Sequence, residues 1–538
     1  MLSYARGPEL PLLEDTLSSA FAKAVACHPD REALIVPFQD VHLSFRELGA
    51  QIERVAGALV ALGLAPGDRF GIWATNCAEW LYLQLAAARA GLVLVNVNPA
   101  YRTSELAYVL RKSRMRALFL HERDRRCDYR AILDEARGSQ AGLALQHVVY
   151  LGTSSWNEFL SASRPVGDIA VSADDVTNMQ YTSGTTGSPK GVLLAHRNVV
   201  NNGYLCTRSL RISADDRIVV PVPMYHCFGC VIGTVPMVTA GAAMIMPAPT
   251  FDPAATMAAI ERYRATVIYG VPTMFIAQLE HANFRRHDFS SLRTGIMAGA
   301  PCPIEVMRRV VSDMHCPQIT IVYGQTESSP IITGSGVDAS LEARVSTVGA
   351  PYPNTEVKIV DPLGETVAVG ERGELCTRGY LVMRGYDDDP EATARAVDSE
   401  GWLHTGDLAT MRPDGMLRIT GRVKDMIIRG GENIYPREIE EFLYTHPKVG
   451  EVQVVGVPDA KLGETVAAWI RLKPDVSASE DEFRDFCRGK IAHYKVPQYI
   501  RLVEEFPMTV TGKIQKFRIR QAEIELRGLR EVARIETA

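Results

Sequence analysis

The sequence predicts an α/β fold: a large N-terminal domain of doubly layered α/β sheets with a β-rich subdomain, followed by a small, mobile α+β C-terminal domain. Its 538 residues, 46% of them hydrophobic and 22% charged, suffice for several domains with large cores. Short β-branched runs alternate with amphipathic segments of helical length through most of the chain, which favours parallel sheets covered by helices. The pattern changes near Asn354 and again near Lys424.

The first part of the chain contains the predicted parallel strands. Amphipathic segments such as 103–112 and 254–263 lie between them, and Pro253 favours a helix start just before the second. The predicted strands cover residues 70–74, 92–97, 117–120, 148–151, 218–222, 267–269 and 319–323.

The pattern after Asn354 favours antiparallel strands, with runs at 356–360, 374–377 and 416–419 and turn sequences between them. The last 110 or so residues predict a compact α+β unit with a strand at 426–428 and a helix at 436–444. We therefore expect one domain at 1–423 and a second at 424–538, joined by a short hinge near Lys424.

Charge and cysteine content exclude several classes of protein. The chain has 58 basic and 63 acidic side chains, a net charge of −5 and no long basic run, so it lacks the charge pattern of a nucleic-acid-binding protein. No secretory signal is recognisable at the start, and ten scattered cysteines fit a reducing cytoplasm. Cys227 and Cys230 form one C-x-x-C pair, but a second pair at zinc spacing is missing.

A run of 34 residues, 218–251, contains no Asp, Glu, Lys or Arg. Such a run has the length of a membrane span, but five prolines and three glycines would repeatedly interrupt a spanning helix. We expect a buried strand–helix–strand segment instead, part of which lines a cavity for an apolar molecule.

Residues 181–191 read Tyr-Thr-Ser-Gly-Thr-Thr-Gly-Ser-Pro-Lys-Gly. Hydroxyl and amide groups bind phosphate oxygens, Gly184 and Gly187 permit close approach, and Lys190 adds positive charge. The spacing is not that of a P-loop NTPase. The segment is a candidate phosphate-binding loop, with an exposed flexible loop as the alternative.

Tyr-Gly-Gln-Thr-Glu at 323–327 directly follows a predicted apolar strand. The carboxyl end of a parallel strand faces the crevice in which α/β sheets bind ligands, so Glu327 is a candidate Mg²⁺ ligand beside a nucleotide and Thr326 a hydroxyl donor. An exposed turn glutamate is the alternative interpretation. Asp407 and Arg422 are candidates for binding ribose hydroxyls, and Lys513 follows a turn near the end of the chain.

Together and in this order, these motifs resemble those of the adenylate-forming superfamily of acyl-CoA synthetases, firefly luciferase and peptide-synthetase adenylation domains. The resemblance covers nearly the whole chain. Segments 98–102, 223–229, 429–436 and 512–517 are most similar to fatty acyl-CoA synthetases of medium-chain type. The resemblance implies an acid–thiol ligase that uses ATP, Mg²⁺ and CoA: a fatty acid attacks the α-phosphate of ATP, and CoA then takes the acyl group from acyl-AMP.

The resemblance also implies a role for each matching residue. Lys513 would bridge the carboxylate and the α-phosphate, Thr326 would contact the α-phosphate, and Glu327 would hold Mg²⁺. His226 would shape the acyl pocket near the carboxylate, with a core-packed histidine as the alternative. The residues implied to bind ATP are Thr182, Ser183, Gly184, Thr185, Thr186, Gly187 and Lys190 at the phosphates, Gly299, Ala300, Pro301, Tyr323, Gly324 and Gln325 around adenine, and Asp407 and Arg422 at the ribose.

The small domain would rotate about Lys424 between the two half-reactions and bring Gly430 and Gly431 to the site, where Gly431 would border the pantetheine tunnel. The acyl pocket would be lined by small or slim residues, namely Gly229, Gly233, Val271 and Ala298. These residues favour an aliphatic medium- or long-chain acid, because each buried methylene adds roughly 0.8 kcal/mol.

Three alternatives stay open at this point. An aryl-CoA ligase would use the same scaffold, and a catalytically inactive nucleotide-binding scaffold would keep the fold without the reaction. Peptide-synthetase adenylation is disfavoured because only 25 residues follow Lys513. The sequence predicts no transmembrane segment and leaves open both peripheral membrane contact and a homodimer.

Overall fold

The structure is a computed structural model that describes residues 1–124, 127–138, 142–182, 189–300, 302–429, 432–459, 461–488, 490–508 and 514–530. The chain forms two compact units. The body unit comprises Ala5–Val357 and Cys376–His404, and the C-terminal unit comprises Met1–Tyr4, Lys358–Leu375 and Thr405–Ala538. The expected boundary between 423 and 424 stays a prediction.

A nine-stranded sheet in the body unit has the order β16-β15-β14-β13-β12-β10-β11-β2-β3. Its six central strands, from β14 to β2, are parallel, and both edges are antiparallel. The strands are β2 (Glu32–Val36), β3 (Val41–Ser44), β10 (Arg217–Val219), β11 (Ala243–Ile245), β12 (Val267–Gly270), β13 (Thr294–Ala298), β14 (Gln318–Gly324), β15 (Ile331–Gly334) and β16 (Ala350–Pro351).

A second sheet of the body unit has seven strands in the order β19-β9-β8-β5-β4-β6-β7. The strands from β8 to β7 are parallel, whereas β9 and β19 add antiparallel pairs at one edge. The strands are β4 (Arg69–Trp73), β5 (Val93–Asn96), β6 (Ala117–Leu120), β7 (His147–Tyr150), β8 (Val176–Thr182), β9 (Lys190–Ala195) and β19 (Gly385–Tyr386).

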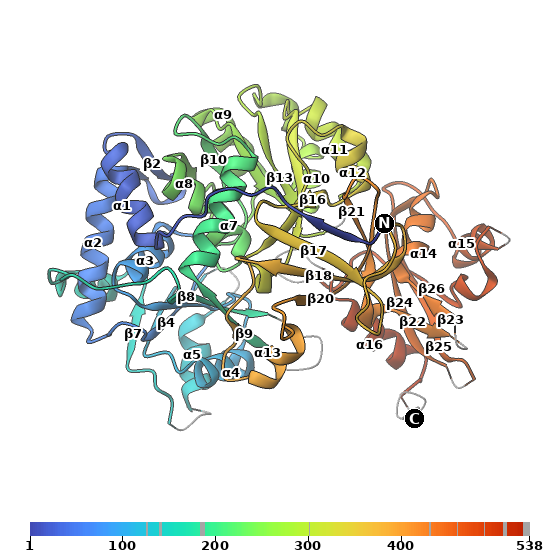
Figure 1. Ribbon diagram of the computed structural model, residues 1–538. Helices are drawn as coiled ribbons and strands as arrows, with labels where there is room; N and C mark the ends of the chain where they lie inside the picture. Colours follow the sequence, from blue (N-terminus) through green and yellow to red (C-terminus); the bar gives the residue numbers. More distant parts are fainter. Residues whose placement is uncertain are drawn as a thin grey trace. The chain divides into compact units, whose positions relative to one another are not determined.

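Helices lie between these two sheets and on their outer faces (Figure 1). Side chains alternate along β10: Ile218 belongs to the core between the sheets and Val219 to the core beneath the outer helices, as the two-residue period of a strand requires. The helices of the core between the sheets are α1 (Leu17–Cys27), α2 (Phe45–Ala61), α3 (Ala78–Arg89), α6 (Ser154–Ser161), α7 (His196–Ser209) and α8 (Val235–Ala240). The outer helices are α9 (Pro253–Tyr263), α10 (Pro272–Leu279), α11 (Ile304–Ser312) and α12 (Leu341–Ser346) on the nine-stranded sheet and α4 (Thr103–Ser113) and α5 (Tyr129–Gly138) on the seven-stranded sheet.

The expected β-rich part is a five-stranded sheet in the order β1-β17-β18-β20-β21. The division between the two units passes through its strands. β20 and β21 pair in antiparallel register, as the turn-rich sequence predicts. The strands are β1 (Tyr4–Arg6), β17 (Thr355–Val360), β18 (Arg372–Gly379), β20 (Leu403–Met411) and β21 (Leu417–Arg422), and helix α13 (Pro390–Ala396) lies between β19 and β20 in sequence.

The C-terminal unit has a sheet of its own, in which β23, β22, β25 and β24 follow one another and β26 pairs with β25. α14 (Pro436–Tyr444) covers the predicted helix exactly because Pro436 occupies a first-turn position and Ile439 and Leu443 share one buried face. The other elements are β22 (Ile427–Arg429), β23 (Glu432–Ile434), β24 (Val449–Asp459), β25 (Gly463–Leu472), β26 (Tyr499–Leu502), α15 (Glu480–Cys487) and α16 (Lys516–Leu526).

The uncharged run 218–251 is the buried strand–helix–strand segment that the sequence predicts. It contains β10, a π-helix at Phe228–Gly233, α8 and β11, and all six residues of the π-helix are buried. None of the helices in the described residues is both long enough and apolar enough to cross a membrane.

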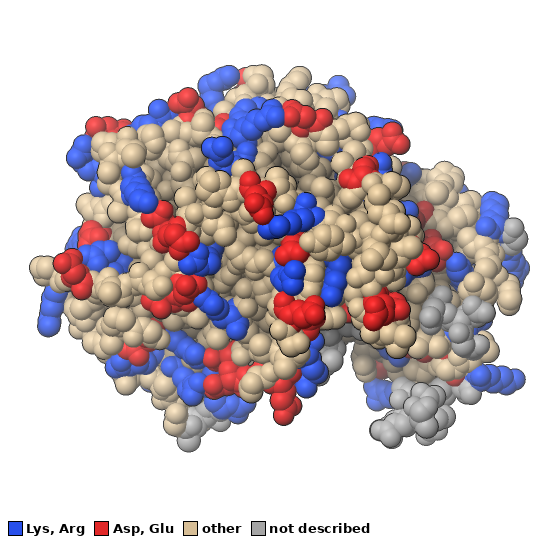
Figure 2. Space-filling view, viewed as in Figure 1, with Lys and Arg blue, Asp and Glu red and all other residues tan. Residues whose placement is uncertain are grey.

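Basic and acidic side chains are interspersed on the face shown in Figure 2, with no large area of one sign. All ten cysteines, which lie within the described ranges, are free thiols.

Candidate functional site

The predicted phosphate-binding loop joins two antiparallel strands. Thr182 is the last residue of β8, Lys190 is the first residue of β9, and the two face each other in the register of the pair. The residues between them that sequence analysis assigns to phosphate binding lie outside the described part of the chain: Ser183, Gly184, Thr185, Thr186 and Gly187. The structure therefore locates both ends of the loop.

The second predicted motif lies at the carboxyl end of β14, the last parallel strand before the antiparallel edge of the nine-stranded sheet. Tyr323 and Gly324 end the strand, and the pairing with β15 shifts register between them. A Cβ on Gly324 would lie 1.8 Å from the Pro330 carbonyl oxygen, so the close approach of the two backbones requires glycine. Gln325 then leads into a short 3₁₀ turn at Thr326–Ser328. The fold thus carries the acidic residue just beyond the strand end, as predicted.

Glu327 connects this strand end to the phosphate loop. Its Oε1 accepts a hydrogen bond from the Tyr386 hydroxyl at 3.0 Å and one from the Thr182 hydroxyl at 3.4 Å. The Lys190 Nζ lies 4.8 Å from the centroid of the Tyr386 ring. A carboxylate, two hydroxyls and an ammonium therefore lie together, although the chain brings them from three separate segments.

Thr326 is 8% exposed and lies next to the segment that contains His226. Its Oγ1 is 3.9 Å from Sγ of Cys227. His226 itself is exposed, and its Nδ1 accepts a hydrogen bond from the Phe228 N–H at 3.2 Å. The core-packed alternative for His226 is therefore wrong, because this side chain is at the surface of the body unit.

The two cysteines of the C-x-x-C pair are buried in the same segment. Burial raises the pKa of Cys230 to about 12 and that of Cys227 higher still. Cys230 Sγ accepts hydrogen bonds from the side-chain amides of Asn96 and Gln180 at 3.5 and 3.4 Å. Since metal binding and thiol chemistry need the thiolate, this environment favours a structural role for both thiols.

The predicted adenine segment follows β13. Gly299 has φ of +86°, which favours glycine, and a Cβ built there would lie 3.2 Å from the Val271 side chain. Ala298, at the end of the strand, is buried and Ala300 is exposed, whereas Pro301 lies outside the described residues. Val271, assigned to the acyl pocket, and Gly299, assigned to adenine, are thus neighbours.

Gly229 and Gly233 belong to the buried π-helix. A Cβ on Gly229 would lie 2.3 Å from the Pro223 carbonyl oxygen, and one on Gly233 would lie 2.9 Å from the Val220 side chain. These glycines allow the π-helix to pack closely on the preceding chain. Room for a substrate is the reason for their small size that the sequence suggests; close packing is a second physical reason.

The predicted ribose-binding pair lies in the C-terminal unit. Asp407 on β20 faces Arg422 on β21, and Arg422 Nε donates to Asp407 Oδ1 at 2.8 Å. Asp407 also anchors a turn, because its N–H donates to the Thr405 hydroxyl at 3.1 Å. The Asp407 side chain is 7% exposed and that of Arg422 is 38% exposed, so the carboxylate of the pair is buried and the guanidinium is partly exposed.

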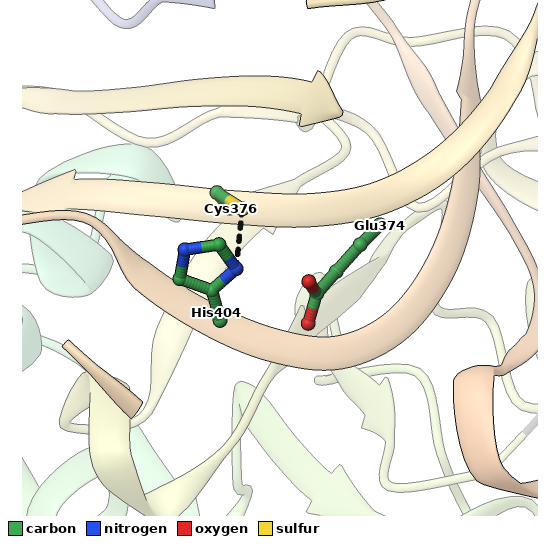
Figure 3. Close-up of side chains that lie close together, drawn as sticks. All are labelled: Glu374, Cys376 and His404. Carbon is green, nitrogen blue, oxygen red and sulfur yellow. Dashed lines mark hydrogen bonds between the residues drawn. The ribbon is translucent and has the colours of Figure 1, made fainter. Parts of the chain in front are cut away.

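Three further side chains were not singled out from the sequence: Glu374 and Cys376 on β18 and His404 on β20 (Figure 3). His404 Nδ1 lies 3.4 Å from Cys376 Sγ. Glu374 Oε1 accepts a hydrogen bond from the Gly406 N–H at 2.9 Å. Because Gly406 directly precedes Asp407, the second contact supports the backbone that presents the Asp407 carboxylate.

The remaining predicted residues belong to the mobile-domain hypothesis. The backbone of Lys424 lies in a 3₁₀ turn at Val423–Asp425, directly after β21. Gly430, Gly431 and Lys513 lie outside the described residues, so their assigned roles stay predictions.

Sequence analysis missed Tyr386 and the ion pair beside it. Asp387 accepts hydrogen bonds from both terminal nitrogens of Arg69, at 2.7 and 2.9 Å, and its N–H donates to the Gly191 carbonyl at 2.8 Å. The Asp387 side chain is 4% exposed. A buried aspartate implies a cationic partner, but Arg69 lies 318 positions away and no local pattern connects the two.

Comparison with known proteins places the chain in a family. The family described as AMP-binding enzyme matches residues 21–387, and its C-terminal domain matches residues 438–513. YngI of Bacillus subtilis (strain 168) is 46% identical, over 96% of this chain and 99% of YngI. The human mitochondrial medium-chain acyl-CoA ligase ACSF2 is 40% identical, over 97% of this chain and 89% of ACSF2.

Among solved structures, the anthranilate CoA ligase AuaEII in complex with anthranoyl-AMP superposes with a TM-score of 0.85. The sequences are 28% identical, and the match covers 95% of this chain and 98% of AuaEII. Motifs, geometry and full-length similarity agree, and the chain belongs to the family of AMP-binding, adenylate-forming enzymes.

Proposed function

We propose that this protein is an ATP-dependent acyl-CoA ligase that activates a medium- or long-chain carboxylic acid through an acyl-adenylate. The observation that carries the proposal is the arrangement around Glu327, where Thr182 and Tyr386 hydrogen-bond to the carboxylate and Lys190 lies beside the same tyrosine. These groups suit a metal–triphosphate substrate, because they supply positive charge, hydroxyl donors and a carboxylate at the ends of a loop rich in Thr, Ser and Gly.

In the first half-reaction, a carboxylate oxygen of the acid forms a bond to the α-phosphorus of ATP. The bond from that phosphorus to the bridging oxygen of the β-phosphate breaks, and pyrophosphate leaves with the electron pair. Thr182, Lys190 and the loop between them bind the outer phosphates, and Thr326 contacts the α-phosphate. The protein contributes position and charge neutralisation, which dominate catalysis of phosphoryl transfer.

The groups around Glu327 fit Mg²⁺, because carboxylate and hydroxyl oxygens are the ligands this hard cation prefers. Bound there with ATP, the cation would neutralise charge on the phosphates. Asp407 and Arg422 bind the ribose hydroxyls, and Lys513 bridges the acid and the α-phosphate. A preorganised donor such as Lys513 contributes about 3–4 kcal/mol to transition-state stabilisation.

In the second half-reaction, the thiol sulfur of CoA attacks the acyl carbonyl of the adenylate, and AMP leaves with the electrons of the broken C–O bond. Lys513 has to leave the site before the thiol arrives. We assign this exchange to a rotation about Lys424 that brings Gly430 and Gly431 to the site, because a short hinge permits such a rotation.

We propose that the acid is aliphatic, with a medium or long chain. The medium-chain name of the relative ACSF2 supports an aliphatic acid. Within this chain, Val271 and Ala298 supply slim walls near the adenine segment, and Gly229 and Gly233 lie in the uncharged run. The similarity to the anthranilate CoA ligase AuaEII favours an aryl acid as the second candidate.

A panel of acids tests the proposal directly. Butyrate to octadecanoate, with benzoate and anthranilate, are incubated with ATP and Mg²⁺, with and without CoA. We expect acid-dependent pyrophosphate release with a maximum at a medium or long aliphatic chain, and thioester only when CoA is present. A maximum with benzoate or anthranilate would establish the aryl-CoA ligase. If no acid in the panel led to pyrophosphate release while ATP still bound, the protein would be an inactive nucleotide-binding scaffold.

The cysteines support a proposal for the cellular location. Ten free thiols, eight of them buried, suit a reducing compartment, and we propose that the enzyme acts in the cytoplasm.

A further inference from the structure

Tyr386 occupies a position between the two charged groups of the phosphate site. Its hydroxyl donates to Glu327 Oε1 at 3.0 Å, and its ring faces the Lys190 Nζ at 4.8 Å from the ring centroid. An ammonium over an aromatic face is attracted by the electron density of the ring. One side chain therefore contacts the acid and the base, through two different kinds of interaction.

The backbone around Tyr386 is fixed from both sides. β19 pairs with β9, so that Tyr386 faces Val192, two residues after Lys190. On the other side, the Tyr386 N–H donates to the hydroxyl of Thr393 in α13 at 2.9 Å. The next residue, Asp387, is held by the Arg69 guanidinium. A tyrosine on such a support loses little entropy when it forms the hydrogen bond to Glu327.

The segment before Tyr386 is attached to the same strand end that presents Glu327. The Met383 N–H donates to the backbone carbonyl of Glu327 at 2.9 Å, and the Ser329 hydroxyl donates to the Leu381 carbonyl at 2.6 Å. Backbone and side chain of Glu327 are thus both held by the segment 381–386. This double attachment is what the orientation of a single carboxylate requires.

The chemistry of the pair allows only one direction for the hydrogen bond. An ionised carboxylate can only accept hydrogen bonds, so the Tyr386 hydroxyl donates and Glu327 Oε1 accepts. The bonds from Tyr386 and Thr182 both end on Oε1. Fixing Oε1 in this way also fixes the direction of the other carboxylate oxygen, Oε2.

We propose that Tyr386 is a positioning residue of the ligase reaction: its hydroxyl orients the Glu327 carboxylate so that Oε2 is presented to the cation that accompanies ATP, and its ring holds the Lys190 ammonium beside the phosphates. The inference rests on the proposed function, because it assigns the cation to the ATP complex. It adds a residue that acts through Glu327 and Lys190 without touching the reacting atoms.

The test uses the full-length Tyr386→Phe variant, which keeps the ring and removes the hydroxyl. Removing a hydrogen bond to a charged acceptor changes an equilibrium constant by roughly tenfold or more. We expect the Mg²⁺ concentration for half-maximal pyrophosphate release to rise about tenfold at saturating ATP and acid. The affinity for Mn²⁺ in the presence of ATP, measured by electron paramagnetic resonance without acid, should fall by a similar factor.

Tyr129→Phe is the matched control. The Tyr129 hydroxyl also donates to a carboxylate, Oδ2 of Asp124 at 2.8 Å, and this tyrosine is 1% exposed in α5. The control therefore loses the same kind of bond at another place in the body unit, and its metal dependence should equal that of the wild type. Equal metal dependence in Tyr386→Phe, Tyr129→Phe and the wild type would overturn the proposal.

A second background separates positioning from direct metal contact. In Glu327→Gln, the added Tyr386→Phe substitution should cause no further loss of Mn²⁺ affinity, because the group that Tyr386 orients has been replaced. A further tenfold loss would show that Tyr386 acts independently of Glu327. Tyr386→Leu, which also removes the ring, should raise the KM for ATP about threefold or more above that of Tyr386→Phe. An unchanged KM would refute the proposal that the ring holds the Lys190 ammonium beside the phosphates.

These readouts also distinguish this inference from the proposed function. If the wild-type protein released no pyrophosphate with any acid, the ligase proposal would fail. The Mn²⁺ titration with ATP would still decide whether Tyr386 controls the cation site through Glu327.

Discussion

The ion pair between Arg69 and Asp387 leads to a quantitative prediction for Asp387→Ala. The Asp387 side chain is 4% exposed and the Arg69 side chain 22% exposed. Removing the carboxylate leaves the guanidinium mostly buried, with the Ser113 carbonyl at 3.0 Å as a remaining acceptor. Breaking a buried pair costs about 3–5 kcal/mol, and the partial exposure of Arg69 places this case near 3 kcal/mol.

The matched control is Asp338→Ala. Asp338 forms a two-point pair with Arg211, but both side chains are more than half exposed, at 69% and 60%. Exposed pairs contribute less than about 1 kcal/mol because water and salt screen them. The comparison therefore isolates burial, since residue types and the two-point geometry are the same.

Urea unfolding followed by tryptophan fluorescence measures the difference. Four of the five tryptophans lie in the body unit, and only Trp469 lies in the C-terminal unit, so the signal reports mainly on the unit that contains Asp387. We expect Asp387→Ala to lower the free energy of unfolding by about 2 kcal/mol more than Asp338→Ala does. Equal effects of the two substitutions would refute the reasoning.

An apolar replacement of both partners provides a second check. Arg69→Met combined with Asp387→Leu should be less destabilised than Asp387→Ala, because no charge is left unpaired. Since Asp387 directly follows Tyr386, we also expect Asp387→Ala to reduce acid-dependent pyrophosphate release below the level of Asp338→Ala.

Three further predictions concern catalysis and pH. Lys513→Ala should lose adenylation by about 10²–10³-fold yet retain thioester formation from supplied acyl-AMP. Gly431→Leu should retain adenylation and lose thioester formation. Equal loss of both half-reactions in either variant would contradict the assignment of the two residues to different half-reactions. Asp407→Asn should raise the KM for ATP about tenfold and abolish discrimination against 2′-deoxy-ATP, whereas unchanged discrimination would exclude Asp407 from ribose binding. His196 accepts a hydrogen bond from the Leu17 N–H, and burial lowers its pKa to about 4 from the 6.5 of the unfolded chain. As the pH falls, the unfolded state therefore binds a proton before the folded state does. The free energy of unfolding should fall as the pH drops from about 6.5 to 4. The loss is at most about 1.4 kcal/mol per pH unit, and urea midpoints at pH 7 and 5 should differ less in His196→Gln than in the wild type.

Local pattern was sufficient for part of the secondary structure of this chain. The expected strand at 117–120 coincides with β6, and the expected helix at 436–444 coincides with α14. Differences occur at strand ends, as at β4, which begins one residue early at Arg69. Hydropathy alone excludes the charged Arg69 from a buried strand. In the folded protein, Asp387 pairs with the guanidinium, and the strand can then include Arg69.

Some residues of the candidate site stood out in the sequence, but their arrangement did not. Thr182 and Glu327 each stood out by composition and by their position after a strand, and the structure brings their side chains within hydrogen-bonding distance. Tyr386 has no such local mark, because a tyrosine in a short strand is ordinary. Only the pairing of β19 with β9 places it beside Lys190.

The glycines of the uncharged run show the same limit. Sequence analysis could recognise that Gly229 and Gly233 are small but not what they face. In the structure, their missing Cβ atoms would collide with Pro223 and approach Val220. Small size therefore serves packing of the π-helix, whatever further part these residues have in the acyl pocket.

By itself, the sequence determined the α/β class, several of the strands and helices, and membership of the adenylate-forming family. These properties depend on the period of apolar residues and on short motifs, which are local. Only the tertiary structure decided which carboxylate meets which hydroxyl, that Tyr386 joins Glu327 to Lys190, and that Arg69 stabilises the turn beside them. The physical reason is that a hydrogen bond or a buried ion pair depends on distances between atoms, and sequence separations such as the 318 positions from Arg69 to Asp387 carry no information about those distances until the sheets have formed.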